Sequence, residues 1–204
     1  MAKRGRKRTP FDVGAALGKA TRLFRTHGYR GTSIQDIVDG TGISRARLYE
    51  TFGDKQGLFL TVLERYGQEY ELGRLAESAR TRSPRKVILN AFESIVSTAP
   101  EGGVGCLMIN TALEVSPRDG TVAELAQRGL SEIERNFRAS VEAGKAAGEV
   151  AAAVDAPQTA SALLSLLIGL HVLARSRPEP ELLSAIAAQA AVLLGSPGQA
   201  STGP

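Results

Sequence analysis

Two arginines separated by one small residue stand in the most informative segment of this sequence. Arg45, Ala46 and Arg47 begin a short helical pattern in which Leu48 and Phe52 recur at the i, i+4 spacing of a buried face. The arginines are then left on the exposed side. A guanidinium can donate two hydrogen bonds to O6 and N7 of guanine, and a small alanine permits contact with a thymine methyl group. The pattern predicts a helix that reads bases in the major groove, unless this is an ordinary solvated charged face.

Another short helix must lie just before the arginine-bearing helix in the chain to hold the arginines at a fixed angle. Thr32 is expected to cap it, with Gln35 reaching back in a capping box. Gly42 then provides the sharp turn, because glycine takes a positive φ without steric cost, and Ser44 caps the second helix. The segment from about 33 to 52 therefore predicts a helix-turn-helix.

The flanking segments have the helical periodicity needed to support such a motif. A helix is expected up to His27, with Gly28 just beyond its end, and Asp54 is expected to cap a further helix. Lys55 would lie in the first turn of that helix, where the helix dipole disfavours a cation. A phosphate partner would account for a lysine at this position.

Residues 10 to 70 closely resemble the DNA-binding domain of TetR-family transcriptional regulators. The residues that carry the resemblance are Leu23-Phe24, Gly28-Tyr29, Thr32-Ser33-Ile34, Asp36-Ile37, Thr41-Gly42-Ile43-Ser44, Leu48-Tyr49, Phe52, Asp54-Lys55 and Leu58-Phe59. The resemblance implies an all-α homodimer whose larger C-terminal domain binds a small ligand. It also implies that Arg45, Ala46 and Arg47 meet bases. The positions that it implies for phosphate contacts are Thr32, Ser33, Tyr49, Thr51 and Lys55.

Charge is unevenly distributed along the 204 residues. Residues 1–55 hold 12 Lys and Arg against 5 Asp and Glu, whereas residues 56–204 hold 13 against 16. A basic N-terminal part on a mildly acidic remainder suits a protein that meets a polyanion, although chance or solubility would also explain it. Residues 1–9 are expected to be a disordered basic arm, which either follows DNA or is simply a solvated tail.

Other compositional features point to a cytoplasmic protein. No apolar run follows the N-terminal charges as it would in a signal peptide, and the stretch from Leu163 to Ala174 is judged too short to span a bilayer. A single cysteine excludes an intrachain disulfide framework and a cysteine-rich metal site. We expect no cofactor, no metal and no membrane partner.

The whole chain carries helical patterns and no convincing strand, so the expected fold is all-α with about nine helices. The expected parts are the arm (1–9), the DNA-binding domain (10–70), a ligand-binding and dimerisation domain (71–195) and a disordered tail (196–204). The last two helices bear apolar residues over more than one stripe. The resemblance puts a dimer interface there, against the alternative of burial within a monomer. The interface residues expected are Leu163, Leu167, Leu170, Leu182, Ile186 and Leu193.

A second informative segment runs from residue 105 to 114. Cys106, Asn110 and Glu114 follow one another at i, i+4 spacing on a mostly apolar helix, and a Gly-Cys-Leu start with a trailing Glu resembles a subset of TetR-like regulators. The functional interpretation is an apolar pocket with few polar groups. The residues expected to bind its ligand are Phe59, Tyr66, Phe92, Cys106, Met108, Asn110, Phe137 and His171.

Each polar residue proposed for this region also has a purely structural interpretation. Cys106 would serve equally as an inert core residue, His171 as a satisfied core histidine, and Asn110 or Glu114 as a partner of a neighbouring helix end. The expected function is a regulator, in the form of a repressor released from a palindromic double-stranded DNA operator by an unknown small-molecule effector. The alternatives are a thiol sensor acting through Cys106, a nonspecific DNA-binding protein and a cysteine-nucleophile enzyme. No phosphate loop or GxSxG motif is present, and we expect no enzyme.

Overall fold

The computed structural model describes residues 12–73, 76, 80, 83–99, 105–115 and 119–197. Within these ranges the elements are nine α-helices and one π-helical segment, with no strand, which confirms the expected all-α fold. The elements are α1 (Val13–His27), α2 (Ile34–Thr41), α3 (Arg45–Phe52), α4 (Lys55–Tyr66), the π-helix η1 (Gly67–Leu72), α6 (Pro84–Thr98), α7 (Leu107–Glu114), α8 (Gly120–Ala146), α9 (Ala156–Ser176) and α10 (Pro180–Leu193). The expected basic arm and residues 198–204 of the expected tail lie outside the described residues.

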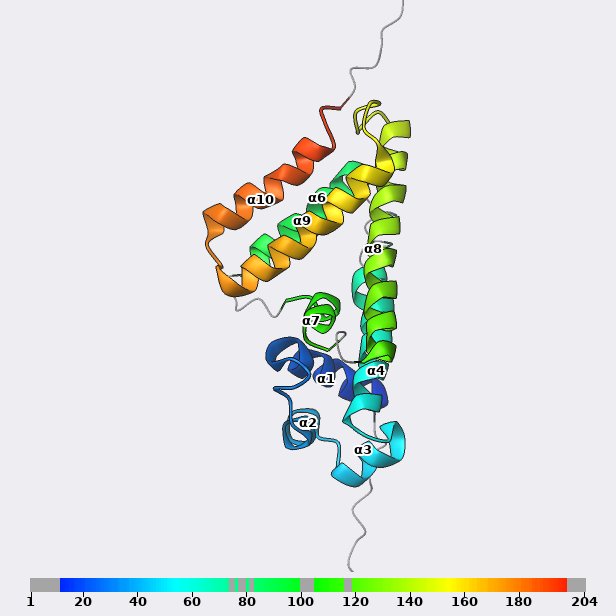
Figure 1. Ribbon diagram of the computed structural model, residues 1–204, viewed down its shortest axis with the longest axis vertical. Coiled ribbons are helices and arrows are strands. Elements are labelled where there is room, and N and C mark those ends of the chain that lie inside the picture. Colours follow the sequence, from blue (N-terminus) through cyan, green and yellow to red (C-terminus); the bar gives the residue numbers. More distant parts are fainter. Residues whose placement is uncertain are drawn as a thin grey trace, which may run out of the picture.

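Two groups of helices follow one another along the long axis of the molecule (Figure 1). Helices α1 to α4, which we call the head, lie at one end. Helices α6, α8, α9 and α10, which we call the body, extend to the other end, with the long α8 reaching down beside α4. Helix α7 lies between the two groups.

The core of the head is built on aromatic side chains. The ring of Phe59 meets Phe24 edge-on at 4.9 Å and Tyr29 at 4.6 Å, distances at which aromatic pairs attract. Leu107 and Ile109 of α7 belong to the same buried cluster as these rings. The apolar core thus continues across the expected boundary at residue 70, and the division of the chain into domains stays a prediction.

The body has its own core, and Arg85 of α6 binds the C-terminal end of the outer helix α10. Phe92 of α6 stacks on Phe137 of α8 at 6.1 Å. The guanidinium of Arg85 donates hydrogen bonds to the carbonyl oxygens of Gly195 (2.7 Å) and Ala191 (3.2 Å). Because the last carbonyls of a helix lack partners within it, Arg85 caps the C-terminal end of α10.

The helix that Asp54 was expected to cap changes character along its length. Helix α4 ends at Tyr66, and the chain continues as the π-helix Gly67–Leu72. A Cβ added to Gly67 would stand 3.0 Å from Cε of Met108, so α7 packs closely against the start of the π-helix. Helical periodicity alone does not reveal such a π-segment, because π-helices are rare and occur mostly as single turns within α-helices.

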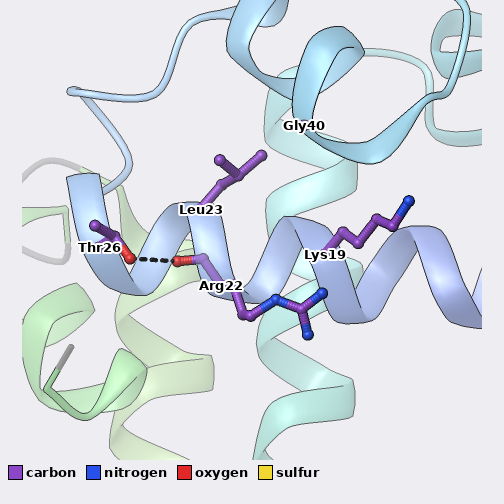
Figure 2. A pocket seen from close by; sticks show the side chains of 5 residues that line it. All are labelled: Lys19, Arg22, Leu23, Thr26 and Gly40. Atoms are coloured by element: carbon purple, nitrogen blue, oxygen red, sulfur yellow. Dashed lines mark hydrogen bonds between the residues drawn. The ribbon is translucent and has the colours of Figure 1, made fainter. Parts of the chain in front are cut away.

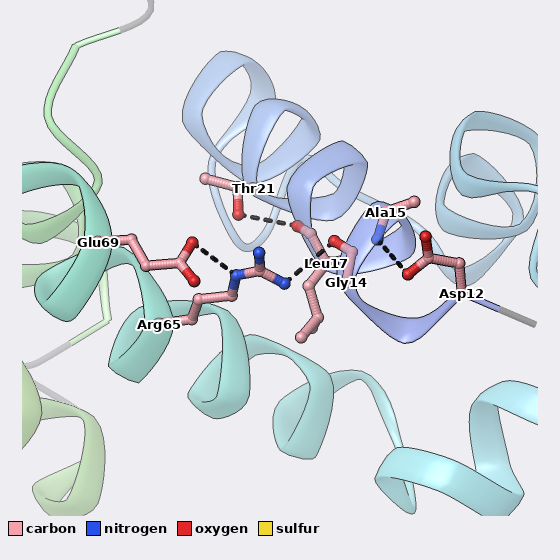
Figure 3. A network of polar contacts seen from close by, with 7 residues as sticks. All are labelled: Asp12, Gly14, Ala15, Leu17, Thr21, Arg65 and Glu69. Carbon is pink, nitrogen blue, oxygen red and sulfur yellow. Dashed lines mark hydrogen bonds and ion pairs between the residues drawn. The ribbon is translucent and has the colours of Figure 1, made fainter.

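A polar network holds α4 against the first turn of α1 (Figure 3). The Arg65 side chain lies between the two helices, with Nη1 donating to the carbonyl oxygen of Gly14 (3.1 Å) and Nε donating to Glu69 (2.8 Å). The carboxylate of Asp12 accepts the backbone N–H of Ala15 and caps α1. The two longest helices of the head are therefore joined by side chains as well as by apolar packing.

The expected N-cap of α2 was wrong by one residue. Ser33 caps the helix and forms a capping box with Asp36, whereas Thr32 is fully buried and its hydroxyl donates to the carbonyl oxygen of Gly28 (2.7 Å). Gln35, the expected box partner, instead donates from its amide to Asp39 (2.9 Å). Both pairs have box spacing, and the burial of Thr32 decides between them.

Helix α9 is longer than the apolar stretch identified in the sequence. It has 21 residues, and an 18-residue window within it has a mean hydropathy of 1.4, so by length and composition alone it passes as a membrane span. The expectation that this segment is too short was therefore wrong. Ala160, Leu163 and Leu170 are buried in the body core. A core helix of a helical bundle passes the same test of length and composition.

Candidate nucleic-acid interface

Local capping fixes the angle between α2 and α3. Gly42 ends α2 with a left-handed backbone (φ 78°, ψ 8°), as the sequence predicted. Ser44 then accepts the backbone N–H of Arg47 (3.3 Å) and caps α3. Ile43 and Leu48 are buried in the angle between the helices, at 2% and 0% exposure. These contacts orient α3 as a rigid unit whose other face is turned outward.

The outward face of α3 holds the residues predicted to touch DNA. Arg45, Ala46, Tyr49 and Thr51 are exposed, and Arg47 is half-buried. This confirms that the arginines lie outside the head core. Their contact with bases stays a prediction.

One side chain of α2 reaches Arg45. Nη2 of Arg45 donates to the amide oxygen of Gln35 at 3.4 Å, while the Gln35 amide nitrogen donates to Asp39. The sequence assigned Gln35 only a capping role, because i, i+3 spacing within one helix says nothing about a neighbour across the turn. Gln35 thus belongs to the same surface as the arginines.

The predicted phosphate contacts divide into exposed and buried groups. Ser33 lies exposed at the N-terminus of α2, and Tyr49 and Thr51 are exposed on α3. Thr32 is 0% exposed, so its hydroxyl has no surface to offer a phosphate. Its role in the structure is to close the turn after α1.

Lys55 lies at the first residue of α4, directly after the cap residue Asp54, which accepts the N–H of Gly57 (2.8 Å). Its ammonium stands 4.3 Å from the centre of the Tyr29 ring, close enough for a cation–π contact. Partial burial lowers the pKa of Lys55, whereas the nearby carboxylates of Glu114 and Asp36 act to raise it. Tyr29 was missed at the sequence level as a partner of this cation.

A shallow pocket of about 220 Å³ lies on the head between α1 and α2 (Figure 2). It is lined by Lys19, Arg22, Leu23, Thr26 and Gly40. Figure 2 shows the ends of Lys19 and Arg22 directed away from each other, and Lys19 donates to the carbonyl oxygen of Thr41 (3.4 Å). The two cations therefore do not converge on one point.

Comparison with known proteins agrees with this geometry. Residues 16–62 match the family model described as bacterial regulatory proteins of the tetR family, and residues 84–190 match the model described as the tetracyclin repressor-like C-terminal domain. The HTH-type transcriptional repressor ComR of Escherichia coli is 33% identical over 187 residues, which cover 90% of this chain and 89% of ComR. The chain belongs to the TetR family of bacterial transcriptional regulators. It is a helix-turn-helix, DNA-binding regulator.

Solved structures of TetR-family proteins share the fold. A regulator from Chloroflexus aurantiacus is 26% identical, with a TM-score of 0.74 over 87% of this chain and 90% of its own. A cysteine mutant of the TetR-family regulator CifR, solved with 26-base-pair double-strand operator DNA, is 28% identical, with a TM-score of 0.74 over 90% of this chain and 97% of its own.

The residues expected to bind a ligand are distributed over both cores of this TetR-family chain. Phe59, Tyr66, Cys106 and Met108 lie in the head cluster that α7 shares, whereas Phe92 and Phe137 stack in the body cluster. Asn110 and His171 are half-buried. None of the eight lines the pocket between α1 and α2, and their grouping around one ligand stays a prediction.

Asn110 has a local feature that fits a ligand-binding role. Its amide nitrogen is buried and has no hydrogen-bond partner in the part of the chain that the structure describes. A buried donor without an acceptor costs about 1–3 kcal/mol, so an acceptor supplied by a ligand would be stabilising there. Cys106 is 1% exposed, and this burial does not favour the thiol-sensor alternative, which needs an accessible thiolate.

The expected dimer residues also divide by burial. Leu163, Leu167 and Leu170 are 0%, 4% and 0% exposed because they pack into the body core of the same chain, so they have no surface left for a partner. Leu182, Ile186 and Leu193 of α10 are half-buried. Stripe patterns identify apolar positions without telling which neighbour covers them.

Proposed function

We propose that this TetR-family chain is a homodimeric repressor that binds a palindromic operator through the outer face of α3 and leaves it when a small molecule binds. The observation that carries the proposal is the exposed group of Arg45 and Ala46 beside Arg47, on a helix whose opposite face is buried through Leu48. CifR, with its operator complex, supports the same use of the head by analogy.

Base and phosphate contacts have different roles in this proposal. Arg45, Ala46 and Arg47 read base edges and so set the operator sequence. Phosphate contacts from Ser33, Tyr49, Thr51 and Lys55 set the position of the head on the duplex. Thr32 supports the turn and does not contact DNA.

The dimer is proposed to form through the outward faces of α9 and α10. Val172 on α9 and Val192 on α10 are 40% and 69% exposed, which is high for aliphatic side chains. Small residues such as Ser165, Gly169 and Ala188 lie on the exposed or half-buried sides of these helices. Small side chains allow helices of two subunits to approach closely, and two heads double the number of DNA contacts.

The effector is proposed to bind where α7 meets the body. Asn110 would supply a hydrogen-bond donor, and the predicted aromatic residues would supply apolar walls. Binding can act on DNA affinity only if the effector has different affinities for the two conformations of the protein. In this proposal a shift of α4 changes the spacing or mobility of the two heads. A regulator that acts on DNA in this way works in the cytoplasm.

The test is selection of duplexes from a random library by the purified protein at near-physiological salt. The proposal predicts enrichment of a palindrome, bound by two chains per duplex in sedimentation experiments. Enrichment of no sequence, or of a site bound by a single chain, would contradict it. A nonspecific DNA-binding protein would instead show steep salt dependence without sequence preference.

A further inference from the structure

The carboxylate of Glu114, the last residue of α7, is bound to the head. Its two oxygens accept the consecutive backbone N–H groups of Tyr29 (3.1 Å) and Arg30 (2.7 Å) in the turn after α1. Hydrogen bonds to an ionised acceptor are stronger than neutral ones. The approach is close, since a Cβ added at Gly28 would stand 2.5 Å from a Glu114 oxygen. Glu114 therefore holds a turn that is 85 residues away in the sequence.

The opposite end of α7 is also attached to α1. Nε of Arg25 donates to the carbonyl oxygen of Gly105, two residues before α7 begins, at 3.0 Å. The Arg25 guanidinium also lies over the Tyr66 ring of α4, 5.6 Å from its centre. Helix α7 is thus bound to the head at both ends, so it cannot shift without breaking one of these contacts or moving α1.

The turn that Glu114 holds is joined to Lys55. The backbone of Tyr29 donates to Glu114, while its ring packs on Phe59 (4.6 Å) and lies under the Lys55 ammonium (4.3 Å). Glu114 is also close enough to Lys55 to oppose the burial that lowers the pKa of its ammonium. A displacement of Tyr29 would therefore remove the surface on which the lysine rests.

The N-terminal half of α7 faces the interior. Met108 packs against two glycines, since a Cβ added at Gly67 or Gly129 would each stand 3.0 Å from its side chain. The amide nitrogen of Asn110, one turn before Glu114, is buried without a partner among the described residues. A ligand or a repacking at this interior end would act on the same short helix that holds the head.

We propose that Glu114 is a positioning residue of the DNA interface, which fixes the α1–α2 turn and thereby Lys55, and that α7 carries changes in the body to the head through this carboxylate. The inference rests on the proposed function, because it assigns a regulatory route to the same interface. It differs from a route through α4 alone in placing the coupling at the turn before α2.

The test compares Glu114→Gln with wild-type protein on the selected operator and on random duplex over a series of salt concentrations. Glutamine can accept only one of the two N–H groups and places its own NH₂ against the other. The expected result is weaker binding to every duplex, with the slope of log affinity against log salt reduced by about one, as for loss of one phosphate contact. Base preference should stay unchanged.

The sign of the effect separates positioning from general electrostatics. Removal of an acidic charge by itself strengthens binding to a polyanion, so long-range charge predicts tighter binding for Glu114→Gln. The matched control Glu142→Gln removes the same charge from an exposed pair on α8 and should leave binding unchanged or slightly tighter. In the double variant with Lys55→Ala, Glu114→Gln should cause no further fall in the salt slope.

Two further measurements are needed: one excludes unfolding of the variants, and the other tests the hydrogen bonds of Glu114 in the wild-type protein. Circular dichroism should give the same helix content for both glutamine variants at the assay temperature. In the wild-type protein, the amides of Tyr29 and Arg30 should exchange with solvent as slowly as those of helical core residues. Rapid exchange there, unchanged binding by Glu114→Gln, or a salt-slope loss additive with Lys55→Ala would overturn the proposal. If Lys55→Ala lowers the slope and Glu114→Gln does not, only this inference fails; if no operator is selected, the proposed function fails.

Discussion

The ammonium of Lys55 lies 4.3 Å from the centre of the Tyr29 ring, at the point where α4 begins beside the turn after α1. A lysine at a helix N-terminus is disfavoured by the helix dipole, and the ring offsets part of that cost. The ring also limits the directions in which the ammonium can point. Lys55 is therefore held in place before any DNA is bound.

Replacement of Lys55 by alanine tests its proposed contact with a phosphate. Lys55→Ala should weaken binding to all duplexes by a common factor and reduce the salt slope by about one, because a single phosphate contact releases about one counterion. Filter binding or fluorescence anisotropy at several salt concentrations measures both quantities. A change of base preference in this variant would show that the faces of the head are wrongly assigned.

The two arginines of α3 should act on sequence preference instead. Arg45→Ala and Arg47→Ala should each flatten the preference at particular operator positions, with a loss of about 1–3 kcal/mol of discrimination per bidentate contact. Repeating the duplex selection with each variant gives the comparison. If both variants retained the wild-type preference at every position, α3 would not be the reading helix.

Arg85 should contribute to the stability of the body and not to DNA recognition. Its guanidinium donates to carbonyl oxygens of Ala191, Gly195 and Glu149, so Arg85→Ala leaves three partly buried acceptors without a donor. We expect the free energy of unfolding in urea to fall by roughly 2–3 kcal/mol. Arg138→Ala, which breaks an exposed pair on α8, is the matched control and should cost about 0.5 kcal/mol. Equal losses in the two variants would show that Arg85 does not cap α10.

The capping box of α2 makes a specific prediction about pH. Hydrogen bonding to the Ser33 side chain, and then to its backbone N–H, holds the pKa of Asp36 below its ordinary value of 3.8. Since the folded pKa is the lower one, the contribution of Asp36 to stability is present above pH 3.8 and is lost as the pH falls through the folded value.

Urea unfolding of wild-type protein and Asp36→Asn at a series of pH values measures that contribution. The difference in unfolding free energy should be constant near neutral pH and should shrink below the ordinary aspartate pKa. Titration of Asp36 by NMR supplies the folded pKa directly. A value above 3.8 would contradict the capping box.

The parts of the head that sequence could predict are those set by neighbours along the chain. Gly42 and Ser44 act within a few residues of where they stand, so their turn and cap were predicted correctly. The choice between Thr32 and Ser33 depends on which side chain the fold buries, and two adjacent hydroxyl residues give no local signal for that. The exposed face of α3 followed from the spacing of Leu48 and Phe52.

Contacts between segments that are far apart in the sequence could not be predicted from the residues alone. Glu114 binds backbone N–H groups, which every residue type except proline carries, so nothing in the sequence of residues 29 and 30 points to it. Leu163 and Leu182 have similar apolar neighbours in the sequence, yet Leu163 is buried by other helices of the chain and Leu182 is half-buried on the outer helix α10. Whether an apolar side chain is buried depends on how the helices pack together and not on the apolar pattern of its own helix.

Guanine N7 methylation interference on the selected operator measures whether the arginines of α3 contact bases in the major groove. A methyl group on N7 blocks the bidentate contact of an arginine from the major groove. We predict that methylation of guanines in each half-site prevents binding of wild-type protein, and that Arg45→Ala or Arg47→Ala becomes insensitive at the guanine its arginine contacts. Wild-type binding that tolerates methylation at every guanine would contradict base reading by α3, and so would variants that both keep the interference pattern of the wild-type protein.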